Sequence, residues 1–300
     1  MNTTTSEQTA LRTSPTRAPR RRLWRKFVRN PVGLLGAVVL LLVVGGAVFA
    51  ERIAPYEPNK QRLLARFTPP FWMAGGSLTY PLGTDNVGRD IWSRMIHGSR
   101  ISLVVGISAI GLSMLIGVTL GLLAGFLGGR LEAIIMAMVD IMLAFPQLIL
   151  AFAMVAVLGP GIGNIVLVLG LTGWERYARV VRAEVLALRE REFVQAARAI
   201  GVPNARIIFC HILPNTLSSV IVLATLQTAQ AILAEAALSF LGLGTGLTYP
   251  SWGQMIAQGR DFINVAWWIS TFPGFAILLT VLAINLMGDR IRDVLDPREI

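Results

Sequence analysis

Long uncharged runs separated by short charged segments dominate this chain. Because about 20 apolar residues cross the hydrocarbon core of a bilayer, five of these runs are long enough to contain membrane-spanning helices. They are Pro31–Ala50, Ile101–Gly129, Ile141–Trp174, Ile212–Ala234 and Phe262–Gly288. The third run is too long for one helix, and the Gly- and Pro-rich turn signal at Gly159–Asn164 divides it into two spans. The pattern therefore predicts an all-α integral membrane protein with six transmembrane helices.

Composition supports a membrane protein and narrows its chemistry. Hydrophobic residues make up 54% of the chain and charged residues 15%, against about 25% charged residues in soluble proteins. The single cysteine, Cys210, excludes an internal disulfide and a cysteine metal cluster, and His97 and His211 lie far apart. No phosphate-binding G-x-x-x-x-G-K-[ST] motif and no Ser-His-Asp or Cys-His set is present. We therefore expect no catalytic residues, no metal site and no cofactor bound by this chain.

The net charge of +10 is concentrated in an N-terminal arm. Residues 1–30 carry eight Arg or Lys and one acid, Glu7, and the arm ends directly at an uncharged run. Nucleic-acid binding is the alternative, but clustered arginine beside an apolar span is typical of a cytoplasmic flank. The run is longer than the apolar region of a cleaved signal peptide and ends in Glu51-Arg52. We expect a cytoplasmic arm at 1–30 and a first transmembrane helix at 31–52.

An even number of spans places both termini in the cytoplasm. Residues 53–100 then form an extracytoplasmic segment, and 101–300 form a core of five transmembrane helices. Within the outer segment, Asp85 could cap a helix that runs toward the second span, with Ile91, Met95 and Ile96 as its apolar face. This interpretation predicts an amphipathic helix at the outer mouth.

A basic, alanine-rich stretch, "REFVQAARAIGVPNARIIFCHILPN", lies between two apolar runs and predicts a cytoplasmic hairpin over 183–213. Residues 183–200 read as one helix that stops at Gly201, expected in a left-handed conformation. A second short helix follows Pro203, and Pro214 bends the chain into the fifth span. The small side chains of Ala196, Ala197 and Ala199 would let a partner approach closely. The alternative is an amphipathic helix resting on lipid headgroups.

Two acids, Asp140 and Glu235, lie within apolar sequence. Because a charge at the bilayer centre is costly, such residues usually face the bundle interior or a wet cavity. Asp140 lies ten residues after Arg130, or about 15 Å of helix rise. Both acids are candidates for the translocation path or for polar contacts between helices. The small-xxx-small sequence "GVTLG" at 117–121 predicts close helix packing.

The hairpin resembles the EAA loop of ABC-importer permeases. The resemblance rests on Gln195, Ala196, Ala197, Gly201, His211, Leu213 and Pro214, with Gln195 where the family has Glu and His211 where it often has Ile. The stretches "LGTDNVGRDIWSRMIHGSR", "EAALSFLGLG" and "FPGFAILLTVLAINLMGDRIRD" resemble the dipeptide/oligopeptide subfamily, and within it the second permease subunit.

This resemblance implies the type I ABC-importer permease fold in a bacterial inner membrane. It further implies import of dipeptides or short oligopeptides by alternating access, with the hairpin docked in an ATPase groove. The implied partners are a homologous permease in a heterodimer, two cytoplasmic ATPase subunits that bind ATP and Mg, an extracytoplasmic solute-binding protein and membrane lipid.

Three alternatives stay open beside peptide import. The same machinery could import nickel chelates or glutathione. A protein of another class, an ion-gradient-driven secondary transporter, would explain six spans and intramembrane acids, but the chain shows no inverted repeat or matched broken helices. A non-transporting membrane scaffold is a third interpretation.

Overall fold

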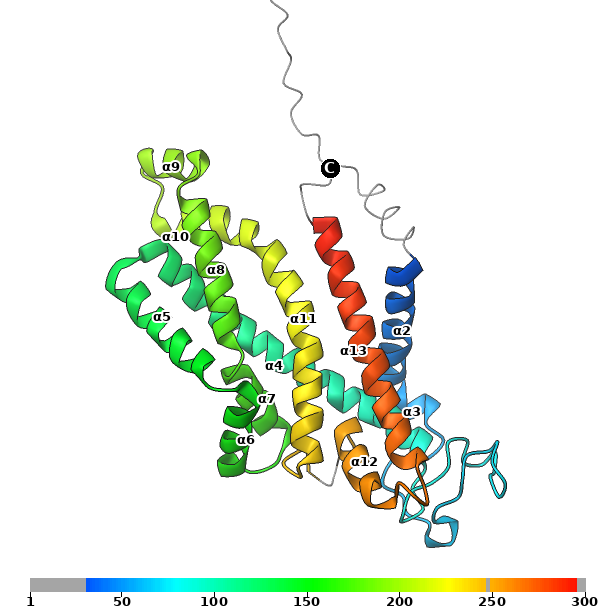
Figure 1. Ribbon diagram of the computed structural model, residues 1–300. Helices are drawn as coiled ribbons and strands as arrows, with labels where there is room; N and C mark the ends of the chain where they lie inside the picture. Colours follow the sequence, from blue (N-terminus) through cyan, green and yellow to red (C-terminus); the bar gives the residue numbers. More distant parts are fainter. Residues whose placement is uncertain (1–30, 247–248, 296–300) are drawn as a thin grey trace, which may run out of the picture.

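The computed structural model describes residues 31–246 and 249–295, and within these ranges the secondary structure is helical (Figure 1). The only strand-like pairing there is an isolated bridge between Thr84 and Asp90. The basic arm at 1–30 lies outside the described residues. The elements are α2 (Pro31–Val48), α3 (Ala50–Ile53), η1 (Leu63–Ala65), α4 (Ile91–Leu127), α5 (Gly129–Ala144), α6 (Gln147–Leu158), α7 (Ile162–Leu171), α8 (Trp174–Arg189), α9 (Glu192–Ala199), α10 (Asn204–Arg206), the π-helical η2 (Ile207–Ile212), α11 (Leu213–Phe240), α12 (Trp252–Gly259), η3 (Arg260–Phe262) and α13 (Trp268–Leu295).

Three helical stretches are long and apolar enough to cross a membrane: Ile91–Leu127, Asn204–Phe240 and Trp268–Asp293. The pair α5 and α6 makes a fourth if it is counted as one span, although the two helices are bent by 90°. The break falls at Phe145–Pro146, because proline lacks an amide hydrogen and favours the extended conformation seen at Phe145. Gly33–Val48 is a shorter apolar helix. The expected turn within Gly159–Asn164 separates α6 from α7, but it is confined to residues 159–161 because α7 begins at Ile162.

Helix α4 is the centre of the bundle and packs against α8 along a row of glycines. A Cβ atom added at Gly117 would lie 2.3 Å from the Trp174 carbonyl oxygen, and one at Gly121 would lie 2.8 Å from that of Ala178. A Cβ atom added at Gly125 would lie 2.7 Å from the Cβ atom of Val185. The prediction of close packing at the small-xxx-small sequence is therefore confirmed, and α8 is the helix that approaches.

The outer amphipathic helix is not a separate element, which corrects the predicted cap at Asp85. Helix α4 begins at Ile91 and continues unbroken to Leu127. Its N-cap is Asp90, whose Oδ2 accepts hydrogen bonds from the Ser93 amide at 2.9 Å and the Ser93 hydroxyl at 2.6 Å. Burial raises the pKa of the Asp90 carboxyl, against the lowering effect of these hydrogen bonds.

Asp85 instead anchors the outer segment to the helices. Its carboxylate accepts from Arg94 on α4 at 2.9 Å, and Arg89 of the same segment donates to Gln258 of α12 at 3.0 Å. The indole of Trp268, at the start of α13, donates to the Thr84 carbonyl at 3.0 Å. The segment between α3 and α4 is thus held by buried polar contacts to three helices.

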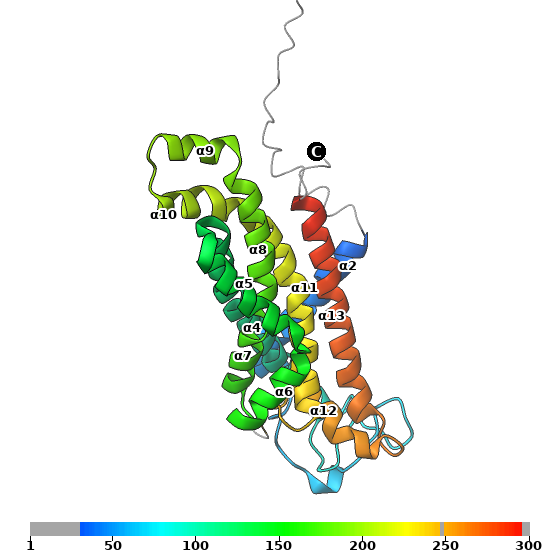
Figure 2. The same cartoon turned by 60° about the vertical axis from the view of Figure 1, so that its left-hand side comes forward.

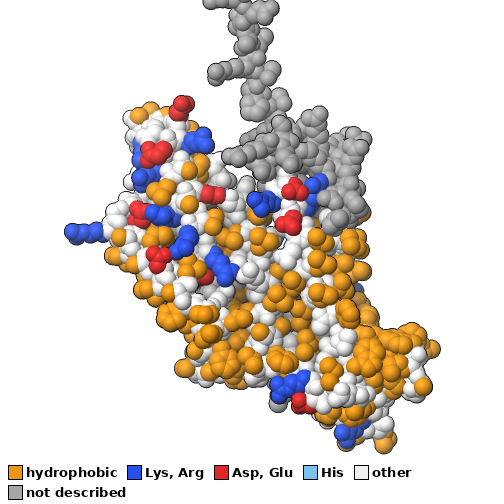
Figure 3. Space-filling model, in the orientation of Figure 1, with side chains coloured by type: hydrophobic (Ala, Val, Ile, Leu, Met, Phe, Trp, Pro, Cys, Tyr) orange, Lys and Arg blue, Asp and Glu red, His pale blue; other side chains and the backbone are white. Residues whose placement is uncertain are grey.

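Successive helices run between the two ends of the molecule in alternating directions. α2, α5 and α11 lead away from the end that carries α9, whereas α4, α8 and α13 lead back toward it (Figures 1 and 2). α12 and the segment between α3 and α4 lie at the opposite end (Figure 1). On the face shown in Figure 3, charged side chains gather over α5, α8 and α9, and hydrophobic side chains fill the band below.

Candidate functional site

The candidate hairpin projects from one end of the bundle and begins later than predicted. Residues 183–200 are not one helix: α8 ends at Arg189, Arg191 is extended, and α9 begins at Glu192. The Gln195 side chain reaches back and donates to the Arg189 carbonyl at 3.1 Å, which partners an oxygen at the end of α8. Residues 183–189 therefore belong to the bundle, and the projecting hairpin is formed by residues 190–212.

The turn of the hairpin depends on Gly201. The Val202 amide donates to the Ala197 carbonyl at 3.0 Å, and the Gly201 amide donates to the Arg198 carbonyl at 3.0 Å. These two bonds define a Schellman motif, in which the residue after the helix takes a left-handed conformation. Gly201 has φ +77°, as predicted. α9 and α10 consequently lie one above the other at the end of the bundle (Figure 2).

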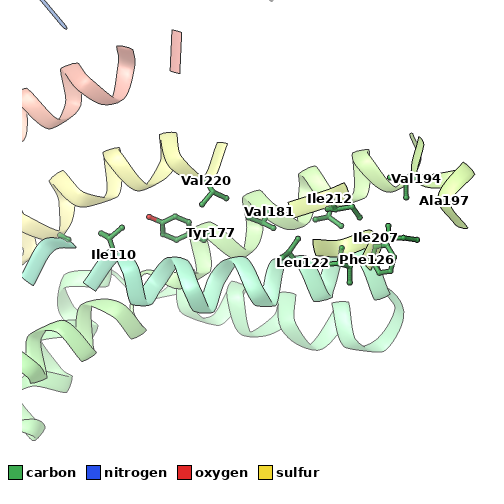
Figure 4. Packing of buried hydrophobic residues seen from close by; sticks show 13 residues of the cluster. Ile110, Leu122, Phe126, Tyr177, Val181, Val194, Ala197, Ile207, Ile212 and Val220 are labelled. Carbon is green, nitrogen blue, oxygen red and sulfur yellow. The ribbon is translucent and has the colours of Figure 1, made fainter. Parts of the chain in front are cut away.

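The alanines of α9 face different environments, which corrects the idea of one small docking face. Ala197 is 7% exposed and belongs to a buried cluster with Phe126, Val194 and Ile207 (Figure 4). Ala196 is exposed. The guanidinium of Arg198 lies 4.9 Å from the centroid of the Phe126 ring, so the base of the hairpin rests on the end of α4.

Large apolar side chains occupy the free surface of the hairpin. Ile200 at the turn is 80% exposed, Phe209 is 63% exposed and Phe193 is 44% exposed. Exposed large apolar side chains on a charged, projecting hairpin suit a protein-protein contact surface. The sequence pattern gave no indication of these three residues, because they do not fall in the alanine-Gly-Leu-Pro spacing.

The second half of the hairpin leads into α11 through an irregular turn. His211 and Leu213 are half-buried and Pro214 is exposed. The π-helical residues Ile207–Ile212 directly precede Pro214, which cannot donate an amide hydrogen bond to the turn before it. The Asn215 side chain donates to the His211 carbonyl at 2.6 Å. The ribbon curves where α10 leads into α11 (Figure 1), and residues Asn204–Phe240 form one continuous helical stretch without a sharp break at Pro214.

The two intramembrane acids differ in their surroundings. Glu235 on α11 is fully buried and accepts hydrogen bonds from Ser102 of α4 at 3.2 Å and from Ser239 at 2.7 Å. Asp140 on α5 is not buried: its side chain is 68% exposed and forms an ion pair with Arg179 of α8. Their part in transport stays a prediction.

Asp140 belongs to a row of polar contacts along α8. Arg182 donates to Glu132 of α5 at 2.6 Å, one turn from the Arg179 pair. Arg176, a further turn along, donates to the side-chain oxygen of Gln227 on α11 at 2.7 Å. The predicted hairpin over 183–213 does not include these arginines, and neither the apolar runs nor the motifs indicated the row. Their spacing of three residues was the signal that puts them on one helix face.

Comparison with known proteins places the chain in a family. Residues 117–300 match the family described as "Binding-protein-dependent transport system inner membrane component", and residues 18–70 match "N-terminal TM domain of oligopeptide transport permease C". The chain is 47% identical over 281 residues to a di/tripeptide transport system permease protein, DppC, of Pseudomonas aeruginosa, covering 94% of this chain and 93% of that protein.

Two further likenesses agree with this match. The dipeptide transport system permease protein DppC of Escherichia coli K12 is 46% identical over 280 residues, with 93% of each chain covered. Among solved structures, the inward-facing MetNI methionine ABC transporter matches with a TM-score of 0.55 at 21% identity, covering 68% of this chain and 97% of that chain. At this identity the structural match supports the fold alone.

Proposed function

The chain belongs to the family of inner-membrane permease components of binding-protein-dependent ABC importers, in its oligopeptide permease C branch, and we propose that it carries dipeptides or short oligopeptides. As such a component it is an all-helical, multi-pass membrane protein that is not itself an ATPase. ATP binding belongs to separate subunits of these systems. The observation that carries the substrate class is the identity of 46–47%, over more than nine-tenths of the chain, to dipeptide and di/tripeptide permeases.

The proposed topology has six spans with both termini in the cytoplasm. α2, α4, α11 and α13 would each supply one span, and the pairs α5–α6 and α7–α8 would supply the other two. The arginine content of the hairpin end and the alternating direction of these elements support this arrangement. The segment between α3 and α4 would then lie outside the cell, where it meets the solute-binding protein.

The hairpin 190–212 is the proposed contact with the ATPase subunits. Gln195, Ala196, Gly201, His211, Leu213 and Pro214 would shape it, and Ala197 would hold it to the bundle. Its exposed residues Phe193, Ile200 and Phe209 suit an apolar groove. Closure of the ATPases on ATP would move the hairpin and, through α8 and α11, rock this chain against a homologous permease in a heterodimer. Such motion would open the path alternately to each side.

Uptake into vesicles tests the substrate class. The chain is reconstituted with its partner permease, the ATPases and the loaded solute-binding protein, and ATP-dependent accumulation of a labelled dipeptide is measured. We expect accumulation that unlabelled peptide suppresses and that an ionophore leaves intact. Accumulation of a nickel chelate or of glutathione in place of peptide would contradict the proposed substrate. Loss of uptake on collapse of the ion gradient, with ATP present, would restore the secondary-transporter alternative.

Substitution of Ile200 tests the docking surface. Ile200→Glu places a charge on an 80% exposed side chain, so folding should be unaffected while copurification of the ATPases falls. Leu64→Glu is the matched control, because Leu64 is also exposed but lies in the segment between α3 and α4. Equal ATPase recovery with both variants would argue for a hairpin that rests on lipid.

A further inference from the structure

A cluster of one arginine and three glutamines lies where α6, α8 and α11 meet. One terminal nitrogen of Arg176 donates to the Oε1 atoms of Gln227, at 2.7 Å, and Gln230, and the other donates to Oε1 of Gln147 at 3.2 Å. Gln147 begins α6 directly after the break at Phe145–Pro146, so the bend of 90° delivers it to Arg176. Two helices, α6 and α11, therefore converge on the guanidinium of α8 through neutral amide groups.

The charge of Arg176 is less neutralised than that of its neighbours on α8. Arg179 and Arg182 form direct ion pairs with Asp140 and Glu132. Arg176 has within the described part of the chain one salt bridge, to the adjacent Glu175, with 3.8 Å between Nε and Oε1. The Glu175 side chain is 4% exposed and points into the bundle, whereas that of Arg176 is 33% exposed. The Arg176 guanidinium is therefore partly exposed and incompletely neutralised, so it can attract an anion.

The position of the cluster indicates a wet cavity and not lipid. Arg176 precedes Arg189, the last residue of α8, by 13 residues, or about 20 Å of helix rise, which in the proposed topology leads toward the membrane interior. Charged side chains at such depth face the bundle interior or water, because exposure to acyl chains is costly. Arg176, Gln147 and Gln230 line a pocket of about 370 Å³ with Leu148 and Leu233. This volume lies in the usual range for small-molecule sites.

We propose that Arg176 and the three glutamines form a subsite for the terminal carboxylate of the peptide in transit. The glutamines turn their oxygens to Arg176, and no hydrogen bond from their Nε2 groups is found among the described residues. A carboxylate can accept hydrogen bonds from these amide groups. It can also accept one from the second N–H of the Arg176 nitrogen that donates to Gln147. The remaining guanidinium N–H can bind a carboxylate through a charge-assisted hydrogen bond and the amide N–H groups can add neutral ones, which gives this subsite its preference.

The subsite rests on the proposed peptide transport and adds a residue-level prediction to it. The amide shell keeps the guanidinium oriented without neutralising it, so binding can be reversible. That is what a translocation path needs, since a carboxylate held too tightly would not leave. An acidic residue of the partner permease is the competing occupant of the same pocket.

The experiment compares a dipeptide with its C-terminal amide in reconstituted vesicles. Both are supplied with the solute-binding protein fully loaded, as checked by direct binding, so that selection by that protein does not contribute. Maximal uptake rates are measured for wild type, Arg176→Gln, Arg176→Lys and Arg179→Gln. In wild type the carboxylate peptide should be carried about tenfold faster than the amide, which corresponds to one charge-assisted interaction.

Arg176→Gln should remove this ratio by slowing the carboxylate peptide alone, and Arg176→Lys should keep part of it. Arg179→Gln, one turn away, should leave the ratio unchanged. A ratio near one in wild type, or one that survives Arg176→Gln, would overturn the subsite. Equal slowing of both peptides, with reduced recovery of the partner permease, would show that Arg176 pairs with an acid of that subunit. If wild type carries neither peptide, the proposed substrate class itself fails.

Discussion

Ser102 on α4 donates a hydrogen bond to the fully buried carboxyl of Glu235 on α11, with 3.2 Å between Oγ and Oε2. Ser239, one turn along α11, donates to the other carboxyl oxygen at 2.7 Å. Two helices are thus joined through an acid that has no salt bridge within the described residues. The contact is a polar clamp near the end of the bundle opposite the hairpin.

Replacement of Glu235 should separate hydrogen bonding from charge. Glu235→Gln keeps an acceptor oxygen, so we expect a small change in thermal stability. Glu235→Leu leaves the hydroxyls of Ser102 and Ser239 without their acceptor in a buried site, at about 1–3 kcal/mol. Thermal unfolding of the purified chain in detergent measures both. A leucine variant as stable as the glutamine variant would show that the clamp is dispensable.

Substitutions at two glycines of α4 should have very different effects on stability, because only one of them lies in the row that packs against α8. Gly121→Leu forces a side chain into the backbone of α8, so we expect destabilisation of about 1–3 kcal/mol or failure to fold. Gly111→Ala is the matched control, because its Cβ would meet nothing within 4 Å. This variant should be neutral or stabilised by up to about 1 kcal/mol through helix propensity. Yield and melting temperature decide between these outcomes.

Substitution of Gly201 should weaken the coupling between ATP hydrolysis and transport through its effect on the hairpin turn alone. No atom lies within 4 Å of a Cβ added there, so only the backbone conformation at φ +77° opposes substitution. Gly201→Val should strain the turn by about 1–2 kcal/mol or more and lower ATPase recovery, while membrane insertion persists. Gly201→Asn tolerates the left-handed region and should retain coupling. Normal ATP-driven transport by the valine variant would argue against a rigid coupling turn.

The ion pair between Asp140 and Arg179 should behave as a solvated pair. Both side chains are more than half exposed, so a double-mutant cycle with Asp140→Asn and Arg179→Gln should give a coupling energy below about 1 kcal/mol. Thermal unfolding of the single and double variants in detergent gives this energy. A much larger value would place the pair in a shielded environment, such as an interface with the partner permease.

Topology is tested by labelling two single cysteines after Cys210→Ser. Glu190→Cys lies at the hairpin and Leu64→Cys lies in the segment between α3 and α4, and both native side chains are exposed. An impermeant thiol reagent added to intact cells should label position 64 and not position 190. The reverse pattern would invert the proposed orientation.

Much of the architecture could be read from the sequence because it depends on local chemistry. Long uncharged runs predict membrane helices, since a bilayer demands internally satisfied backbone groups. Gly201 predicts a left-handed helix end, because it acts through its own backbone geometry. The spacing around the hairpin was enough to indicate the family.

What the tertiary structure alone decided is which side of each helix is covered. Ala196 and Ala197 are chemically identical, yet one is exposed and the other is buried against Phe126, because the end of α4 approaches only one face of α9. The sequence does not show which residues the arginines of α8 contact, because the glycine row of α4 is what brings α8 into the bundle. Their partners come from three other helices, far apart in sequence, and side-chain pairing across such distances depends on how the helices pack.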